Sequence, residues 1–573
     1  MCKKICIVNN MPEGNASLEN FLPVFKARIL KRCPNTVFVE NETAEQTVII
    51  SIDETIGKDG YRIESDGKKT SVIGSTDLGV LYGLGKLLRL ADYADGFAAP
   101  VIVETFVPTS PFRGIQFDTH FGNFYHMAPE DELSTYVQDI ILWGINYVDV
   151  VFPFIDFKDW DDPEMEKITG QIKIIYKTAK ALGVKVGVEV VPNQDFIVFN
   201  EKIKGIPVPD DTKCRAYHGH NICPNKEGAM EYIRTKTYGK LFAYFKERDI
   251  VMDFLCFWPY DEGGCGCEKC YPWGARGYLK SSKAIYEIAK EYLPDVEVIL
   301  STWLFDTSGE NEWEGLDKVL SESNDWVDYI LADSRDAFPR YPLEQGVPGN
   351  LPLLSYPEIS MWALYPWGGY GANPLPERFE MLWNQVKGHV AGGIPYSEGI
   401  FDDLNKIVTT AFFWNCDTTA NDTVREYLNY EMGPAVHDDV REIIRIIEHN
   451  QTITAPGFTG KWANTKADVA LAKQAVDLIA VVEAKLPDWA KNEWRWRMIA
   501  IRAELDYIRY QAAIDRRNDL TPDTLWTEML SGSDRAKVLL TELVDIIHND
   551  QDYDRSIHPT YHFVAPPLKD VFF

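Results

Sequence analysis

Residues 112–120 read FRGIQFDTH, a short strand-like run that ends in polar side chains able to do chemistry. Similar apolar runs recur at 145–152, 184–191, 252–259, 296–305, 326–333, 351–358 and 392–399. Amphipathic stretches of helical length lie between several of them, for example at 131–144 and 281–293. Parallel strands covered on both faces have this apolar character. Eight such strands alternating with helices predict an α/β fold, a (β/α)8 TIM barrel.

The residues that follow each run should meet at one mouth, because the carboxyl ends of barrel strands lie on the same face. Carboxylates and aromatic rings dominate these positions, and such a cleft suits sugars, whose apolar faces stack on rings while their hydroxyls donate to carboxylates. One or two aromatic residues in the loops after the fifth and seventh strands are expected to form a sugar platform. The candidate substrate-binding residues at this mouth are Asp118, His120, Tyr260, Trp303, Tyr356, Trp367 and Tyr396.

The flanking segments differ in pattern from the barrel. Strand-like segments at 36–40, 47–53, 61–67 and 70–75 precede a helical run at 76–93, for which Ser75 or Thr76 is the candidate N-cap. Beyond about residue 420, helical periodicity returns and persists. The sequence therefore predicts an N-terminal α+β domain at 1–107, a catalytic barrel at 108–420 and a C-terminal helical domain at 421–573.

The composition narrows the class of partner. The net charge is −28, and no cluster of lysine and arginine is visible in the sequence, so nucleic acid and anionic membrane are unfavourable partners. The first apolar stretch is too short for a secretory signal, and no later run approaches the length of a membrane span. We therefore expect a cytoplasmic protein that acts on a small glycan, and homo-oligomerisation stays open.

The segment FWPYDEGGCGCEKCYPWG, residues 257–274, places two carboxylates at the end of the fourth strand. Glycosidic cleavage needs one carboxyl to protonate the leaving oxygen and a second group to stabilise the positive centre. Asp261 and Glu262 can divide these tasks, and packing against Trp258, Tyr260 or Trp303 would raise the pKa of Glu262. The alternative is that the pair only caps the following turn in solvent.

Glu358 and Glu398 end the seventh and eighth runs and are the further catalytic candidates. Either could be the base or nucleophile of a two-carboxylate mechanism. Their separation from Glu262 would then distinguish inversion (about 6.5–9.5 Å) from retention (about 5–5.5 Å). Hydrogen bonding to substrate hydroxyls without chemistry is an equally good interpretation of each.

Cys265, Cys267 and Cys270 lie close enough in sequence for their thiolates to converge on one ion. Cys223 is the candidate fourth ligand, and Cys214, His218 and His220 are alternatives from the same loop. Tetrahedral zinc fits these atoms, and such a closed site would be structural. Reduced thiols or one disulfide are the alternatives. We expect no cofactor to be required for catalysis.

Three segments resemble known glycoside hydrolases. Residues 61–88, YRIESDGKKTSVIGSTDLGVLYGLGKLL, resemble the small domain that precedes the barrel in family 20 β-N-acetylhexosaminidases and family 67 α-glucuronidases. PFRGIQFDTHFGNFY, residues 111–125, resembles the first barrel strand of family 20. WNCDTTANDTVREYLNYEMGPA, residues 414–435, is similar to the helical region of the wider group, including uncharacterised barrel proteins with a C-x-C-x-x-C turn.

The family 20 resemblance implies an exo-acting, retaining β-N-acetylhexosaminidase-like enzyme. It implies that Glu262 is the general acid and that Asp261 orients the substrate 2-acetamido group, whose carbonyl oxygen is the nucleophile. It also implies that Arg113 binds sugar hydroxyls, and more loosely that Glu398 does. The residues before the Asp-Glu pair depart from the family pattern, which bears on the N-acetyl group more than on glycosidase chemistry.

Two other functions stay open. An α-glucuronidase-like inverting hydrolase would need basic residues for the uronate, and Arg113, Arg215 and Arg335 are available. A non-catalytic carbohydrate-binding protein on a barrel scaffold is the alternative from a different class, although several carboxylates at the mouth argue against it.

Overall fold

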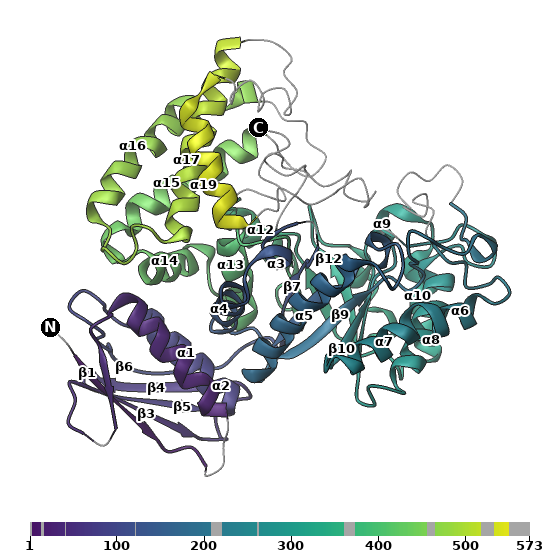
Figure 1. Cartoon of the computed structure of the whole chain (residues 1–573), viewed down its shortest axis with the longest axis horizontal. Coiled ribbons are helices and arrows are strands. Elements are labelled where there is room, and N and C mark those ends of the chain that lie inside the picture. Colours follow the sequence, from purple (N-terminus) through teal and green to yellow (C-terminus); the bar gives the residue numbers. More distant parts are fainter. Residues whose placement is uncertain are drawn as a thin grey trace.

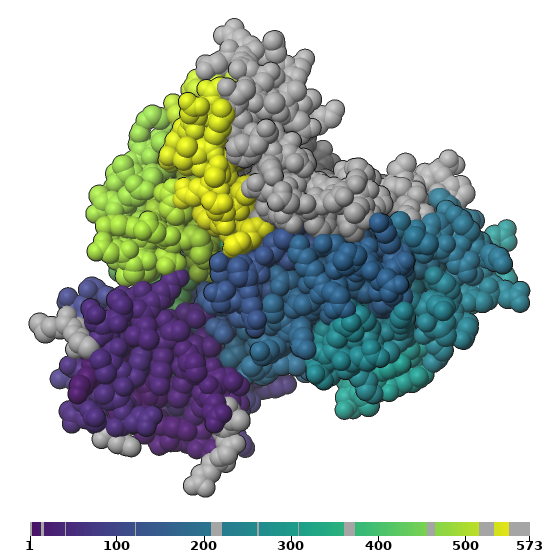
Figure 2. All heavy atoms as spheres, in the orientation of Figure 1, coloured from purple at the N-terminus to yellow at the C-terminus, as the bar shows by residue number. Residues whose placement is uncertain are grey.

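The computed structural model describes residues 3–12, 17–40, 42–120, 122–207, 221–260, 263–359, 373–454, 464–516 and 532–548. Three parts follow one another along the chain: an N-terminal sheet with two helices, a barrel and a set of C-terminal helices (Figure 1). In the space-filling view the N-terminal part contacts both the barrel and the C-terminal helices (Figure 2).

The N-terminal part is a six-stranded sheet in the order β2-β1-β3-β5-β4-β6, in which β4 runs antiparallel to both of its neighbours. Helices α1 (Ser17–Arg32) and α2 (Asp77–Leu90) lie beside it (Figure 1). Thr76 caps α2 by accepting a hydrogen bond from the Gly79 N–H, as predicted. The strands are β1 (Lys4–Asn9), β2 (Val37–Val39), β3 (Gln46–Ile52), β4 (Tyr61–Asp66), β5 (Lys69–Gly74) and β6 (Val101–Phe106).

The second sheet is a closed barrel of parallel strands, which confirms the predicted fold class. The eighth strand is made of two short pieces, β14 (Gly392–Gly393) and β15 (Tyr396–Ser397), and both pair with the first strand. The other seven strands are β7 (Phe112–Phe117), β8 (Tyr147–Val151), β9 (Lys185–Val190), β10 (Phe254–Phe257), β11 (Glu297–Ser301), β12 (Tyr329–Asp333) and β13 (Leu353–Tyr356).

Helices surround the barrel strands and bury their apolar faces against them. In α5, for example, Asp162 caps the first turn and Pro163 occupies the first helical position, where its missing N–H costs nothing. The barrel helices are α3 (Phe124–Met127), α4 (Glu130–Ile141), α5 (Pro163–Ala181), α6 (Ala229–Lys236), α7 (Tyr238–Glu247), α8 (Leu279–Ala289), α9 (Phe305–Ser308), α10 (Glu312–Glu322), α11 (Tyr341–Glu344), α12 (Pro376–Val386) and α13 (Asp403–Trp414).

The C-terminal part is helical in the residues that the structure describes. Its helices are α14 (Ala420–Glu431), α15 (His437–Thr454), α16 (Val469–Lys485), α17 (Trp494–Arg516) and α19 (Asp534–Ile547). Within the same described ranges, we find no helix with both the length and the hydrophobicity that a membrane span requires.

Buried ion pairs join the three parts. Arg28 of α1 contacts Asp139 of α4 at 2.6 Å, and Arg495 of α17 contacts the same carboxylate at 3.3 Å. Arg495 also binds Asp403 of α13 at 2.8 Å. Burial alone would raise the pKa of Asp139, but the two guanidinium groups lower it to about 2. The charges at this junction are therefore paired with opposite charges.

Candidate active site

The carboxyl ends of β7, β13 and β15 meet at the barrel mouth. Tyr396 lies beside Gln116 in the strand register, and Glu358 lies beside Tyr396. Residues paired across parallel strands share a face, and alternate residues along a strand share one too. Asp118 follows Gln116 by two positions and Glu398 follows Tyr396 by two. The structure thus brings together four of the predicted site residues: Asp118, Glu358, Tyr396 and Glu398.

Tyr396 bridges two buried carboxyl groups. Its phenol oxygen lies 2.7 Å from Asp118 Oδ2 and 2.7 Å from Glu398 Oε1. A phenol has one hydrogen to donate. Both contacts can therefore be hydrogen bonds only if one carboxyl carries a proton and donates it to the phenol oxygen. The arrangement is therefore a hydrogen-bonded chain that holds a neutral carboxyl.

Glu398 is the carboxyl that keeps its proton. Burial, followed by repulsion from Asp118, raises the pKa of Glu398 from its ordinary 4.5 to about 8, although the Tyr396 hydrogen bond lowers it. Asp118 Oδ1 lies 2.5 Å from His120 Nδ1, a contact that becomes an ion pair when the imidazole is protonated. We therefore assign the proton of this chain to Glu398 at neutral pH.

The backbone on both sides of Glu398 is held in place. The Tyr125 hydroxyl lies 2.7 Å from Ser397 Oγ and donates to the Gly399 carbonyl at 3.0 Å. The buried Lys406 ammonium also donates to that carbonyl and forms an ion pair with Asp402. These contacts orient the Glu398 carboxyl toward Tyr396, a rigid arrangement of the kind that binding sites require.

Aromatic rings form the rest of the group. Trp258 stacks on Trp303 with ring centres 5.7 Å apart, and Tyr356 lies 4.8 Å from Trp258 and 6.0 Å from Tyr396. The indole N–H of Trp303 is buried and has no hydrogen-bond partner among the described residues. Buried indole N–H groups usually find an acceptor. Trp303 thus offers a donor to a polar ligand at this mouth.

A polar layer supports the rings from inside the barrel. Gln116 donates to Glu189 at 2.7 Å and accepts from the Tyr356 hydroxyl at 2.7 Å. Sequence reasoning gave no role to Gln116 and did not give Trp258 a place among the site residues. The signal that could have found them is strand alternation, because each lies two residues from an inward-facing position.

Arg335 places a cation near the rings. Its guanidinium carbon lies 5.3 Å from the centre of the Trp303 ring. The neighbouring Asp333 ends β12, and burial raises the pKa of Asp333 to about 7 even though Arg335 opposes the shift.

Two predicted catalytic residues, Asp261 and Glu262, and the predicted platform residue Trp367 lie outside the described residues. The neighbours of the carboxylate pair are described. The Gly263 N–H donates to the Tyr260 carbonyl at 3.2 Å. The Tyr260 hydroxyl donates to Glu312 at the start of α10, so the Tyr260 side chain anchors this segment and does not join the group at Tyr396.

Arg113 lies elsewhere, and its predicted role in binding substrate needs correction. It is the second residue of β7, and its guanidinium donates to the carbonyls of Ser110 and Gly144, before the starts of β7 and β8. It also binds Asp59 of the N-terminal part at 3.0 Å. Arg113 is fully buried. Its charge is therefore used at the opposite end of the strand, between the N-terminal part and the barrel.

Four of the cysteines form a cluster beside the mouth. The sulfur atoms of Cys223, Cys265, Cys267 and Cys270 all lie within 4.8 Å of one another. Cys223 belongs to the segment after β9, and the other three belong to the segment after β10. The structure thus places together the four cysteines predicted as ligands, whereas Cys214, His218 and His220 lie outside the described residues.

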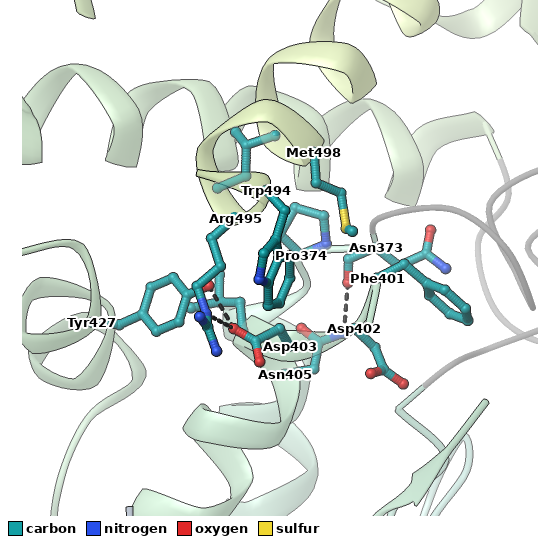
Figure 3. Close-up of a pocket in the computed structure, with 12 residues that line it drawn as sticks. Asn373, Pro374, Phe401, Asp402, Asp403, Asn405, Tyr427, Trp494, Arg495 and Met498 are labelled. Atoms are coloured by element: carbon teal, nitrogen blue, oxygen red, sulfur yellow. Dashed lines mark hydrogen bonds and ion pairs between the residues drawn. The ribbon is translucent and has the colours of Figure 1, made fainter. Parts of the chain in front are cut away.

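A separate small cavity lies between the barrel and the C-terminal helices (Figure 3). It has room for about one water molecule, about 20 Å³. Asp403 lines it and accepts hydrogen bonds from both Tyr427 and Arg495, which line it too. A cavity of this size is too small for a sugar, so it belongs to the domain junction.

Comparisons with known proteins identify the fold. No family model matches the chain, and no curated protein does. A solved family 115 4-O-methyl-α-glucuronidase with specificity for decorated arabinogalactans is similar at a TM-score of 0.66 and 11% identity, covering 98% of this chain and 80% of its own. A family 89 glycoside hydrolase from Clostridium perfringens, solved with PUGNAc, is similar at a TM-score of 0.60 and 13% identity, covering 93% of this chain and 65% of its own.

A family 20 β-N-acetylhexosaminidase from Streptomyces coelicolor is also similar, at a TM-score of 0.51 and 12% identity, covering 76% of this chain and 91% of its own. The chain therefore has a TIM-barrel fold of the kind found in glycoside hydrolases. At these identities the likeness concerns the fold, and it extends across the flanking domains in families 115 and 89.

Proposed function

We propose that the protein is an exo-acting glycoside hydrolase. The observation that carries the proposal is the chain Glu398–Tyr396–Asp118, in which a carboxyl that keeps its proton and a second carboxyl lie beside stacked aromatic rings at the barrel mouth. Glycosidic cleavage uses a pair of carboxyls in different environments, and a stacking surface beside them suits a sugar ring. The fold of the similar structures supports the same class.

In the finer proposal the enzyme is retaining and β-N-acetylhexosaminidase-like. Glu262 is the general acid, and Asp261 orients the 2-acetamido group, whose carbonyl oxygen attacks the anomeric carbon. The resemblance of the segment at Asp261 to family 20 supports these roles. Asp118 and Glu398 then bind the hydroxyls of the terminal sugar through carboxyl oxygens that accept, while Tyr396 holds the two groups in place.

A second candidate is a glycosidase that uses two enzyme carboxylates, such as an α-glucuronidase. The position of Arg335 over Trp303 favours it, because a guanidinium at the mouth can bind a uronate. Glu358 or Glu398 would be the second carboxylate. Since Glu398 keeps its proton at neutral pH, Glu358 is the better base or nucleophile of the two.

The test is initial-rate hydrolysis of p-nitrophenyl glycosides, including β-GlcNAc, β-GalNAc, β-Glc, β-Gal and glucuronides, by the wild type and the Glu262→Gln variant. Turnover of one sugar that falls by about 10²–10⁴-fold in the variant supports the acid. Loss of a general acid matters less when the leaving group needs no proton. The same variant should therefore recover relative activity on 2,4-dinitrophenyl glycosides.

Glu358→Gln separates the two candidates. Substrate assistance predicts a modest loss, because the nucleophile belongs to the sugar. A two-carboxylate mechanism predicts a loss of about 10³-fold or more, as seen when a catalytic group is removed. No turnover of any glycoside, together with glycan binding, would overturn the proposal in favour of a carbohydrate-binding protein.

A further inference from the structure

The cysteine cluster has the dimensions of a metal site. Cys223 Sγ lies 3.7 Å from Cys267 Sγ and 3.7 Å from Cys270 Sγ. A zinc ion with four sulfur ligands at about 2.3 Å requires sulfur–sulfur distances of about 3.8 Å around a tetrahedron. Since all four sulfurs lie within 4.8 Å of one another, small side-chain movements would complete that geometry.

Hydrogen-bond donors surround the sulfurs. Asn225 Nδ2 donates to Cys270 Sγ at 3.2 Å, and the Lys280 ammonium donates to Asn225 Oδ1 at 2.7 Å. Backbone N–H groups donate to two other sulfurs, that of Asn225 to Cys223 and those of Ile206 and Cys267 to Cys265. Four thiolates around a dication keep a net negative charge, and outer hydrogen bonds of this kind stabilise and orient such ligands.

The cluster fits a metal better than disulfides. A disulfide needs two sulfurs at about 2.05 Å and commits each sulfur to one partner. Here Cys223 lies equally close to two sulfurs. Cys223, Cys265 and Cys270 are buried, and Cys267 is half-buried, so the cluster is a compact interior site.

We propose that Cys223, Cys265, Cys267 and Cys270 bind one zinc ion as thiolates, each thiol losing its proton on binding. With four protein ligands the site is closed, so the zinc is structural and takes no part in catalysis. It cross-links the segments that follow β9 and β10, which are separated by two helices in sequence.

Asn193 reinforces this link between the two segments. Its side-chain amide donates to the carbonyls of Ile222 and Gly264, both at 2.9 Å, and accepts from the Gly264 N–H at 3.1 Å. Ile222 precedes Cys223 and Gly264 precedes Cys265, so amide and metal would hold the same two segments. Where Glu262 is the general acid, as proposed above, the zinc holds the segment that follows it.

Metal analysis of the purified full-length protein tests the site without reference to activity. We expect about one zinc per chain and no iron. A thiol-modifying reagent should release the zinc. Replacement by Co²⁺ should give the intense visible bands of a tetrahedral thiolate complex. Folded wild-type protein that contains iron, or that binds neither zinc nor Co²⁺ under reducing conditions, would overturn the proposal.

Serine variants assign the ligands. Cys223→Ser and Cys267→Ser should lose most of the zinc and lower the Tm by several degrees, because metal binding contributes folding free energy. Cys416→Ser is the matched control, since Cys416 is half-buried like Cys267 and lies outside the cluster. This variant should keep the full zinc content. Ligand variants that fold and retain a full zinc equivalent would contradict the assignment. If they do not fold, the wild-type metal and Co²⁺ measurements decide.

Discussion

Two groups of buried charged residues follow opposite rules. At the junction of the three parts, Asp139 lies between Arg28 and Arg495, which lower the pKa of Asp139 to about 2 against the effect of burial. At the barrel mouth, burial and the neighbouring Asp118 raise the pKa of Glu398 to about 8. One carboxyl is held as an anion between cations, and the other is held neutral beside a second carboxyl group.

The difference separates stability from function. Opposite charges that satisfy one another join elements, and removing one partner leaves an unpaired buried charge. Carboxyls crowded together in a desolvated cleft gain nothing for folding from that crowding, and strongly perturbed groups of this kind gather at functional sites. The comparison therefore predicts that mutations at the mouth change activity, whereas mutations at the junction change stability.

The largest effect should come from the carboxylate pair after β10. Glu262→Gln should lower kcat/KM by about 10²–10⁴-fold with little change in Tm, because the proposed general acid is removed. Glu322→Gln is the control, since Glu322 is exposed at the end of α10. A Glu262→Gln enzyme as active as this control would remove Glu262 from the mechanism.

Arg113→Met extends the comparison to the base of the barrel. It should lower the free energy of unfolding by about 3–5 kcal/mol, because Asp59 is left buried without its partner. Denaturant unfolding measures this loss, and kcat/KM of the folded enzyme should stay within about twofold. A selective rise in KM with unchanged stability would instead restore the substrate-binding role that the sequence suggested.

Tyr396→Phe removes the hydroxyl that links the two carboxyls at the mouth. We expect kcat/KM to fall by about tenfold, the effect of losing one buried hydrogen bond. Tyr286→Phe, on α8 in the outer ring of helices, is the matched control. Equal rates in the two variants would show that the bridge has no part in turnover.

Glu398→Gln should change the pH dependence of stability. Between pH 4.5 and 8 the folded wild type binds a proton at Glu398 that the unfolded chain has lost, so its stability falls as pH rises through this range. Glutamine removes this dependence. The Tm of the variant relative to the wild type should therefore rise by a few degrees from pH 5 to pH 8, as measured by thermal melts. A difference in Tm between variant and wild type that is the same at pH 5 and pH 8 would mean that Glu398 titrates normally.

The fold could be predicted from the sequence because each barrel strand is a buried apolar run. The eighth strand is the partial exception. Pro395 lacks an N–H and separates the two short pieces of this strand. The position of the eighth strand was therefore predictable, but its division into two pieces was not. Helix α1 is absent from the predicted elements, and Pro23 within it weakens the helical pattern.

The site was less predictable, because it depends on where each residue lies along its strand and on how loops far apart in sequence pack together. Arg113 was assigned to the mouth by resemblance, yet it precedes Asp118 by five residues, about 16 Å along a strand at about 3.3 Å per residue. Counting residues would have placed it at the other end. Cys223 illustrates the converse: its sequence neighbours offered several possible fourth ligands, and only the packing of two loops shows which sulfur joins the cluster.

The most direct test compares the same substitution in the two regions. Asp118→Asn and Asp139→Asn each remove one buried carboxylate, the first at the mouth and the second at the junction. We predict that Asp118→Asn lowers kcat/KM by about 10²-fold or more with little change in Tm. We predict that Asp139→Asn lowers the free energy of unfolding by about 3 kcal/mol with unchanged kcat/KM. Similar losses of stability in both variants, with activity retained at the mouth, would contradict the account.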